Sequence, residues 1–324
     1  MFLIENKSHD PAWNLALEEH LFQLAGRNGQ SYVMFWRNAP SVIVGRFQNT
    51  AEEIDETAVA EAGVRVIRRS TGGGAVYHDL GNLNYSLIVA HDDLAGFDYR
   101  SLADPILKTL AGLGVAAELS GRNDLTVGGL KISGTAQQSG PSSVLYHGTL
   151  LYDVDLYRLS RMLKVDPAKY ESKGVKSIRS RVCNLKPLLA ANFLLKDLEA
   201  ELVRAIKPLP LALSRSDLAA VHEIKTAKYD RWDWNWGRSP EFTARLEQRF
   251  PWGKISLRLN VVDGRIREAK IFGDFFSHDL GELESGLHGR RYDGLELMEA
   301  LRPLTQLVRG ASEKDLTVLA GLPL

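Results

Sequence analysis

Apolar residues at helical spacing are clearest near the start of the chain. In the stretch DPAWNLALEEHLFQLAG (10–26), four apolar residues share one helical face: Trp13, Leu17, Leu21 and Leu24. Asp10 is a candidate N-cap, and Pro11 suits the first helical position, where a backbone N–H has no intrahelical partner. The pattern predicts a helix that starts at Pro11 and stops before Gly26.

Short runs of β-branched and aromatic residues follow this helix. YVMFW (32–36) and SVIVG (41–45) flank the turn sequence RNAP, so together they predict a hairpin. Further strands are predicted at 64–68, 84–89 and 144–154, and helices at DPILKTLAGLG, LYRLSRML and FLLKDLEAELVRAI. Antiparallel hairpins outnumber βαβ units in this order. We therefore expect an α+β fold, with a mixed, largely antiparallel sheet and flanking helices, and not a Rossmann fold.

The last quarter of the chain predicts a second, smaller unit. Here ISLRLNVVDGRIREAKIF contains two strand-like runs around Asp263 and Gly264, a strong hairpin turn. A chain of 324 residues is long enough for two cores. We expect a catalytic domain at 1–245 and a small α+β accessory domain at 250–324. Just before the boundary, Trp232, Trp234 and Trp236 alternate like one face of a core-packed strand.

Charge and cysteine content narrow the class of protein. The 40 basic residues balance the 40 acidic ones, so overall charge favours neither a nucleic-acid nor a membrane partner. Cys183 is the only cysteine and cannot form an internal disulfide. The first ten residues contain three charged side chains where a signal peptide would be apolar, and no stretch approaches the roughly 20 apolar residues of a membrane span. These features predict a cytoplasmic protein.

The stretch RRSTGGGAVYHD (68–79) has the composition of an anion-binding loop. Its three consecutive glycines let backbone N–H groups approach a ligand, and Arg69 adds a planar cation suited to phosphate or carboxylate. It is not a dinucleotide fingerprint, because the third glycine would fall at Tyr77. A Walker A loop is also excluded, because Leu130 and not glycine precedes Lys131. A plain glycine-rich turn is the alternative interpretation.

Lys131 lies in a second stretch of small residues, GRNDLTVGGLKISGTAQ (121–137). A compact ammonium group there can bridge two oxygens at close range. Asp124, on the preceding predicted strand, can either orient this lysine or hold Mg²⁺, which prefers oxygen ligands. Taken alone, such a lysine is more simply a solvated surface charge.

Four other polar residues have two interpretations each. His78 and His147 can hydrogen-bond a ligand or brace the backbone around them. Arg46 and Asn49 follow a predicted strand end, where they can face a pocket or belong to a surface loop.

Together these stretches resemble the lipoate-protein ligase A family. The strings RRSTGGGAVYHDLGN, GRNDLTVGGLKISGTAQ, HGTLLYDVDL and KGVKSIRSRVCNL occur in the family's order and spacing, and NLALEEHLF and WDWNWG are also similar to its segments. The similarity covers nearly the whole chain, including the accessory domain. It implies a catalytic domain related to biotin protein ligases and class II aminoacyl-tRNA synthetases.

The resemblance also implies roles for individual residues. Lys131 is expected to be catalytic and to contact both lipoate and nucleotide. The implied lipoate-binding residues are Arg69, Ser70, Thr71, Gly72, Gly73, Gly74, Ala75, His78 and Lys131. The implied ATP-binding residues are Arg69, Gly74, Ala75, Val76, Tyr77, Asp124, Lys131, Lys173, Ser177 and Arg179. Asp124 is also the candidate Mg²⁺ ligand, and the loop 173–185 is expected to close over the adenylate.

The activity implied is ATP-dependent activation of lipoate to lipoyl-AMP, followed by transfer of the lipoyl group to a lysine of an acceptor protein. Octanoate is an expected alternative substrate, and Mg²⁺ an expected cofactor. The expected acceptors are lipoyl domains of 2-oxoacid dehydrogenases and the glycine-cleavage H protein.

Three rival functions use the same sequence features. An octanoyl transferase would need Cys183 as its nucleophile, and the basic loop around it is compatible with a lowered thiol pKa. A biotin ligase would carry a different glycine-arginine loop from RRSTGGGAVYHD. A non-catalytic lipoate carrier would bind ligand without releasing pyrophosphate.

Overall fold

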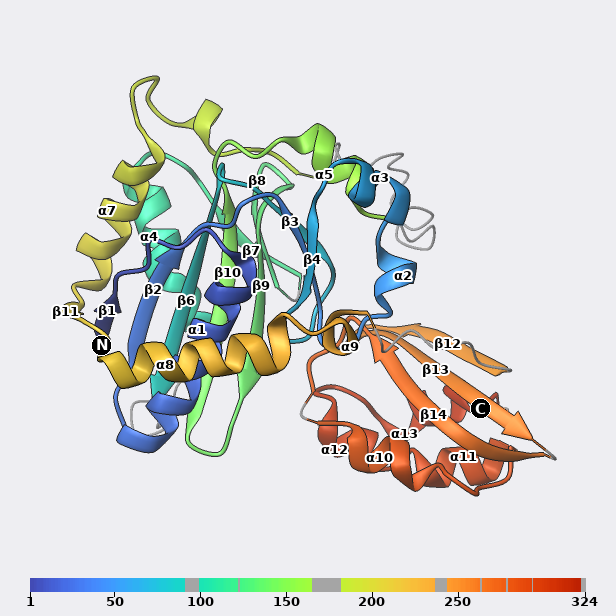
Figure 1. Ribbon diagram of the computed structural model, residues 1–324. Helices are drawn as coiled ribbons and strands as arrows, with labels where there is room; N and C mark the ends of the chain where they lie inside the picture. Colours follow the sequence, from blue (N-terminus) through green and yellow to red (C-terminus); the bar gives the residue numbers. More distant parts are fainter. Residues whose placement is uncertain are drawn as a thin grey trace.

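The structure is a computed structural model that describes residues 1–90, 99–121, 123–164, 182–236, 244–262, 264–277, 279–292 and 294–321. Its largest element is an eight-stranded sheet in the order β11-β1-β2-β6-β10-β9-β8-β7 (Figure 1). The strands are β1 (Phe2–Ile4), β2 (Tyr32–Trp36), β6 (Asn82–Ala90), β7 (Glu118–Ser120), β8 (Asp124–Val127), β9 (Leu130–Ser139), β10 (Ser143–Leu151) and β11 (Leu209–Leu211). β1 runs parallel to β2 and β11, and the other neighbours are antiparallel. The predicted mixed, largely antiparallel sheet is confirmed.

The two faces of this sheet support two separate cores. Successive residues of a strand point to opposite faces, so in β2 Phe35 packs with α4 (Asp104–Gly112) and α7 (Leu195–Ile206), whereas Met34 packs with α1 (Pro11–Asn28). Every residue of β6 and β10 is buried, as expected for central strands covered on both faces.

Helix α1 begins as its sequence predicts and ends later. The Asp10 carboxylate accepts the N–H of Ala12, and Pro11 occupies the first turn. The helix runs past Gly26 to Asn28 and stops at Gly29, whose φ of 69° is the left-handed conformation of a C-cap. The predicted end was wrong because Gly26 keeps helical geometry inside the packed helix.

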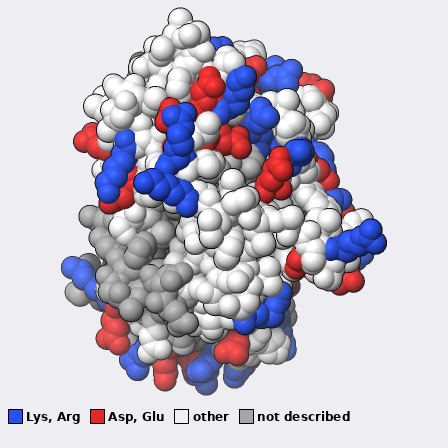
Figure 2. Space-filling model, turned by 90° about the vertical axis from the view of Figure 1, so that its left-hand side faces the viewer, with Lys and Arg blue, Asp and Glu red and all other residues white. Residues whose placement is uncertain are grey.

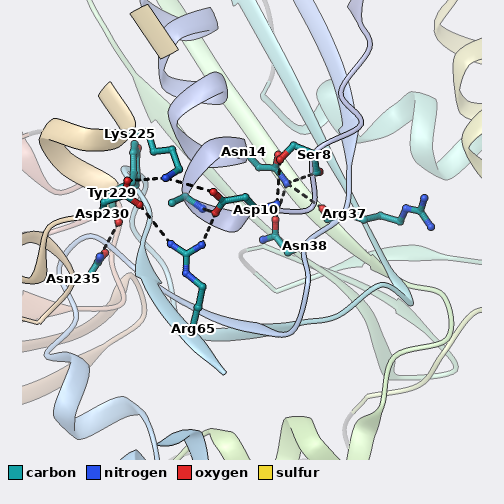
Figure 3. A network of polar contacts seen from close by, with 11 residues as sticks. Ser8, Asp10, Asn14, Arg37, Asn38, Arg65, Lys225, Tyr229, Asp230 and Asn235 are labelled. Atoms are coloured by element: carbon teal, nitrogen blue, oxygen red, sulfur yellow. Dashed lines mark hydrogen bonds and ion pairs between the residues drawn. The ribbon is translucent and has the colours of Figure 1, made fainter. Parts of the chain in front are cut away.

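Asp10 also joins three elements that are distant in sequence (Figure 3). Its carboxylate pairs with Arg65 (2.6 Å) and Lys225 (3.5 Å). Both cations also pair with Asp230, Arg65 at 3.5 Å and Lys225 at 2.7 Å. The start of α1 is therefore tied to β4 (Arg65–Arg68) and to the π-helical turn Lys225–Tyr229 that extends α8 (Arg215–Ile224).

The predicted hairpin between 32–36 and 41–45 is wrong. β3 (Ser41–Val44) leaves the large sheet and forms a three-stranded sheet with β4, to which it is parallel, and β5 (Val76–His78), to which it is antiparallel. β2 already has β1 on one edge and β6 on the other, so it has no free edge for β3. Three short helices flank this region: α2 (Thr50–Glu53), α3 (Glu56–Glu61) and α5 (Leu156–Met162).

The tryptophan segment is helical, so its predicted strand is also wrong. Trp232–Asn235 forms the short helix α9. Trp232 is 67% exposed, whereas Trp234 packs against the α1 core and Trp236 against the β3–β4 core. Only two of the three rings are therefore core residues. Within α9, Trp234 points away from the side of Trp232, and Trp236 follows the last residue of the helix.

The C-terminal segment has its own sheet and core. The strands are β12 (Ala244–Phe250), β13 (Gly253–Val262) and β14 (Arg265–Gly273), paired antiparallel in that order. The helices are α10 (Gly281–Gly286), α11 (Gly294–Ala300), α12 (Leu304–Leu307) and α13 (Glu313–Leu319), which lie along the sheet (Figure 1). The predicted hairpin at 263–264 is present as the β13–β14 pair, although Asp263 itself lies outside the described residues. The boundary at 245–250 stays a prediction.

Among the described residues, no helix has both the length and the apolar character that crossing a membrane requires.

Replacing Asp10 with alanine should lower the free energy of unfolding by about 1–2 kcal/mol, because the helix loses its N-cap. Asp10→Asn is the matched control, since asparagine caps helices equally well and the ion pairs are partly exposed. Urea denaturation measures both variants. Equal losses for the two would show that charge and not capping matters at this position.

Candidate functional site

Arg69 organises the glycine-rich loop between β4 and β5. Its guanidinium is buried and donates to the backbone oxygens of Gly72 (2.6 Å) and Gly74 (2.8 Å) and to the Thr71 hydroxyl (2.9 Å). A further N–H reaches the Ile43 oxygen at 3.2 Å. Burial lowers the pKa of Arg69 to about 10, partly offset by Glu18, so the side chain remains a cation at neutral pH. The predicted arginine therefore bonds to the loop itself.

This arrangement fixes the direction of the loop N–H groups. In a planar trans peptide the N–H of the next residue points away from the preceding carbonyl oxygen. Because the oxygens of Gly72 and Gly74 point to Arg69, the N–H groups of Gly73 and Ala75 point the opposite way. Such outward N–H groups form an anion cradle.

The loop leaves no room for side chains at two glycines. A Cβ on Gly72 would lie 2.1 Å from the Phe275 oxygen, and a Cβ on Gly45 would lie 2.0 Å from the Gly73 oxygen. Gly73 also has a φ of 90°, which favours glycine. Phe275 belongs to the C-terminal segment, so that segment covers one side of the loop.

Lys131 is held at the start of β9. Its Nζ lies 2.8 Å from the Asp124 carboxylate, and both side chains are about one-third exposed. The same Nζ lies 2.8 Å from the position that a Cβ on Gly134 would take. The lysine side chain therefore runs along β9 and ends over Gly134, opposite Asp124 in the register of β8 and β9.

The glycine-rich loop and Lys131 converge on one face of the sheet. A Cβ built on Gly73 lies 3.8 Å from the Cβ of Ala136. Gly134 and Ala136 are two residues apart on β9, so they point to the same face. The cradle and the ammonium group are thus close enough to bind adjoining groups of one ligand.

Beneath the loop, a buried hydrogen-bond chain leads to Glu18 of α1. The Thr71 hydroxyl lies 2.9 Å from Nε2 of His147, and Nδ1 of His147 lies 2.8 Å from the Glu18 carboxylate. Glu18 also accepts from Ser86 (2.6 Å), whose oxygen accepts the indole N–H of Trp36 (2.9 Å). His147 therefore connects the loop to the helix that our prediction treated only as core.

His78 lies on β5 beside this chain. Burial, Arg69 and His147 lower the pKa of His78 to about 3, so the ring is neutral at physiological pH. Its Nδ1 lies 3.1 Å from the amide nitrogen of Asn38. Tyr77, the preceding residue, points into the opposite core.

Known proteins match this chain over nearly its whole length. The lipoyl protein ligase A/B catalytic domain family matches residues 10–207, and the bacterial lipoate protein ligase C-terminus family matches 239–319. The chain is 42% identical to the lipoate-protein ligase LplJ of Bacillus subtilis over 93% of each chain. The chain belongs to the lipoate-protein ligase family. The family predicted from sequence is therefore confirmed.

Solved structures of the family have the same fold. LipL1 of P. falciparum, in complex with lipoate, is 26% identical with a TM-score of 0.81, over 99% of this chain and 98% of that one. A bi-partite ligase of Thermoplasma acidophilum, studied with its E2 lipoyl domain, is 28% identical with a TM-score of 0.65, over 75% of this chain and 98% of that one. A lipoate-protein ligase A bound with ATP is 27% identical with a TM-score of 0.64, over 73% of this chain and 98% of that one.

Part of the predicted site of this ligase lies outside the described residues: Lys173, Ser177 and Arg179. The end of the same loop is described. Val182 pairs with Lys131 as an isolated bridge, and the N–H of Cys183 donates to the Lys131 oxygen (2.9 Å). Burial raises the pKa of the Cys183 thiol, which disfavours the thiolate that an octanoyl transferase would need.

The other predicted residues that the structure describes lie in the loop, against a core, beside the C-terminal segment or before α2. Ser70 and Thr71 are buried in the loop, and Val76 packs partly against the α1 core. Arg46 pairs with Asp279 of the C-terminal segment (2.7 Å), so it joins the two parts of the ligase. Asn49 precedes α2 and its side chain does not cap that helix.

Sequence reasoning missed Arg68, which is fully buried in the ligase. Its guanidinium donates to the oxygens of Gln48 (2.6 Å) and Trp234 (2.8 Å) and to the Thr50 hydroxyl (2.7 Å). The indole N–H of Trp234 in turn donates to the Arg68 oxygen (2.8 Å). Arg68 therefore fastens the WDWN helix to the base of the glycine-rich loop. The two adjacent arginines were visible in the sequence, but it gave no sign that Arg68 and Arg69 bond to different segments.

Gly72→Ala should lower the free energy of unfolding by about 1–3 kcal/mol, because the new methyl group collides with the Phe275 backbone oxygen. Gly74→Ala is the control, since nothing lies within 4 Å of a Cβ there. Its effect should stay within about 0.5 kcal/mol. Thermal denaturation compares the two, and equal stability of both variants would contradict the described contact.

Proposed function

We propose that this chain activates lipoate with ATP and then transfers the lipoyl group to a lysine of an acceptor protein. The observation that carries the proposal is the convergence of Lys131 and the Gly73 backbone over neighbouring residues of one β9 face. That arrangement supplies a cation and fixed N–H dipoles to adjoining groups of one ligand. Family membership supports the same activity.

The first step overcomes the poor reactivity of a carboxylate. One oxygen of the lipoate carboxylate attacks the α-phosphorus of ATP, a new P–O bond forms, and the bond to pyrophosphate breaks. The product, lipoyl-AMP, carries a phosphate that leaves readily. Negative charge gathers around the α-phosphate during this exchange, so the protein contributes mainly positioning and charge stabilisation.

Lys131 and the loop divide this task between them. The ammonium group of Lys131 bridges the lipoate carboxylate and the α-phosphate, and the N–H groups of Gly73 and Ala75 point to the phosphate oxygens. Arg69 acts through the loop, because its donors hold the oxygens of Gly72 and Gly74. It is a positioning residue in this scheme.

Mg²⁺ is proposed to enter with ATP. This ion is usually bound by one or two carboxylates together with substrate phosphates. Asp124 is one such carboxylate, but its oxygen already pairs with Lys131. We therefore assign Asp124 chiefly to the orientation of Lys131.

In the second step the neutral amine of an acceptor lysine attacks the acyl carbon and the amide C–N bond forms. The acyl C–O bond to AMP breaks with its electron pair on AMP, and the nitrogen releases one proton to solvent. Lipoyl domains of 2-oxoacid dehydrogenases and the glycine-cleavage H protein are the proposed acceptors. The archaeal relative and its E2 lipoyl domain support the first class. Octanoate is proposed as an alternative acyl substrate, and the cytoplasm as the compartment that supplies ATP.

Lys131→Ala should lower lipoate-dependent pyrophosphate release by about 100- to 1000-fold, the usual cost of losing one well-aimed donor. Stability should be nearly unchanged, since the side chain is partly exposed. Lys108→Ala is the control, because Lys108 is an exposed lysine on α4, across the sheet. Near-normal release by the Lys131 variant would refute the proposed role.

Asp124→Asn should lower kcat by about 10-fold or more, because loss of the ion pair lets the Lys131 ammonium group move away from the reacting atoms. The half-saturating Mg²⁺ concentration should stay unchanged, because the proposed role removes no metal ligand. A Mg²⁺ titration of pyrophosphate release measures both quantities. Recovery of full activity at high Mg²⁺ would instead make Asp124 a metal ligand.

A further inference from the structure

A straight row of residues crosses the sheet from the proposed reaction centre. Trp36 of β2 pairs with Asn84 of β6, and Asn84 pairs with Thr149 of β10. The Thr149 hydroxyl accepts the N–H of Gly134 on β9 (3.2 Å). Lys131 Nζ lies over that same glycine. Paired residues point to one face, so the row connects the ammonium group with the Trp36 ring.

The length of this row matches the proposed substrate. From β9 to β2 there are three strand spacings of about 4.8 Å, or about 14 Å in total. An extended eight-carbon acid spans about 10 Å with C–C bonds of about 1.5 Å. With its carboxylate in hydrogen-bond contact with Lys131, the far end of the acid reaches the neighbourhood of Trp36.

His78 lies at this far end. Its ring meets the Trp36 ring edge-on, with centroids 6.2 Å apart and an interplanar angle of 71°. Nε2 of His78 is completely buried, and no hydrogen-bond partner for it exists among the described residues. A buried polar atom without a partner costs free energy, so its presence calls for a ligand atom.

Two asparagines determine what His78 offers to that ligand (Figure 3). The side-chain nitrogen of Asn14 faces the backbone oxygens of Ser8 (3.1 Å) and Arg37 (3.0 Å), which can only accept, so its identity as the NH₂ group is certain. It also donates to the side-chain oxygen of Asn38 (2.8 Å). The NH₂ group of Asn38 must then face Nδ1 of His78 (3.1 Å).

The result is a single tautomer. Nδ1 of His78 accepts from Asn38, so the proton of the neutral ring resides on Nε2. Burial and the neighbouring Arg69 and His147 keep the ring neutral. The far end of the row therefore presents one buried N–H donor.

We propose that the Nε2–H of His78, fixed by Asn14 and Asn38, donates to an acceptor atom at the distal end of the acyl substrate and thereby favours lipoate over octanoate. The dithiolane sulfur of lipoate is such an acceptor, although a weak one, and the terminal methyl group of octanoate is none. The proposal rests on the proposed function and assigns the acyl selectivity of the same site. His78 is a specificity residue, and Asn14 and Asn38 are positioning residues.

The direct test is NMR of the wild-type chain labelled with ¹⁵N-histidine. Long-range ¹H–¹⁵N spectra distinguish the two tautomers, and the spectrum of His78→Leu identifies the His78 signals among the eight histidines. We expect the Nε2–H tautomer from pH 5 to 8, and an Nε2 shift on addition of lipoate but not octanoate. An Nδ1–H tautomer, or equal responses to both acids, would overturn the proposal.

Kinetics give an independent measurement. His78→Leu should lower the ratio of kcat/KM for lipoate to that for octanoate, in pyrophosphate release, by about 3- to 10-fold, the effect of one modest hydrogen bond. Asn84→Leu is the matched control. Asn84 also has a buried nitrogen without a described partner, but it lies mid-row, beside the methylene chain that both acids share. The Asn84 substitution should change kcat/KM for lipoate and for octanoate by the same factor.

Failure of the proposed function and failure of the His78 role give different results. If the wild-type chain activates neither acid, the proposed function fails. If it activates both acids and the His78 substitution leaves their ratio unchanged, or the Asn84 substitution moves the ratio as much, only the role of His78 fails.

Discussion

The set of hydrogen bonds from Arg69 to its own loop is the constraint on which the site depends. A glycine-rich segment is intrinsically free to adopt many conformations, and fixing it costs conformational entropy. Arg69 offsets this cost by holding the oxygens of Gly72 and Gly74, and this turns the next N–H groups outward. In the proposed scheme a buried cation thus prepares the anion site without touching the anion. Such preorganisation is the main contribution a protein can make to phosphate chemistry.

Buried polar groups extend this constraint into the α1 face of the sheet. Thr71, His147 and Glu18 form one chain, and Asn14, Asn38 and His78 form another. Both begin on α1, whose start is fixed by the Asp10 ion pairs. Networks of this kind are costly when incomplete and rigid when satisfied. The partnerless Nε2 of His78 is therefore informative, because the other nitrogen of the same ring is bonded to Asn38, which Asn14 holds in turn.

The sequence predicted much of the fold because local patterns and tertiary packing agreed. The Asp10-Pro11 signal placed α1, and the Asp263-Gly264 signal placed the β13–β14 hairpin. The hairpin expected at 32–45 failed for a non-local reason, since the partners of β2 come from residues 2–4 and 82–90. The strand expected at the tryptophans failed because a period of two over five residues also occurs in a short helix.

The candidate site was predictable where glycines or an isolated lysine stand out, as in 72–74 and at Lys131. Residues whose roles depend on distant partners gave no such signal. Glu18 looks like a solvated helix residue in the sequence, yet it is buried under the loop and accepts from Ser86 and His147. Arg68 and Arg69 are adjacent and equal in type, but strand alternation sends their guanidinium groups to different segments.

The most direct test of the central claim is a crystal structure with a non-hydrolysable lipoyl-adenylate analogue, such as the sulfamoyl adenosine. The account predicts that the acyl carbonyl oxygen and the phosphate-replacing group lie about 3 Å from Lys131 Nζ and from the N–H groups of Gly73 and Ala75. The acyl chain should run across β10 and β6 toward Trp36. An analogue bound on the α4–α7 face, or with Lys131 pointing away from it, would contradict the account.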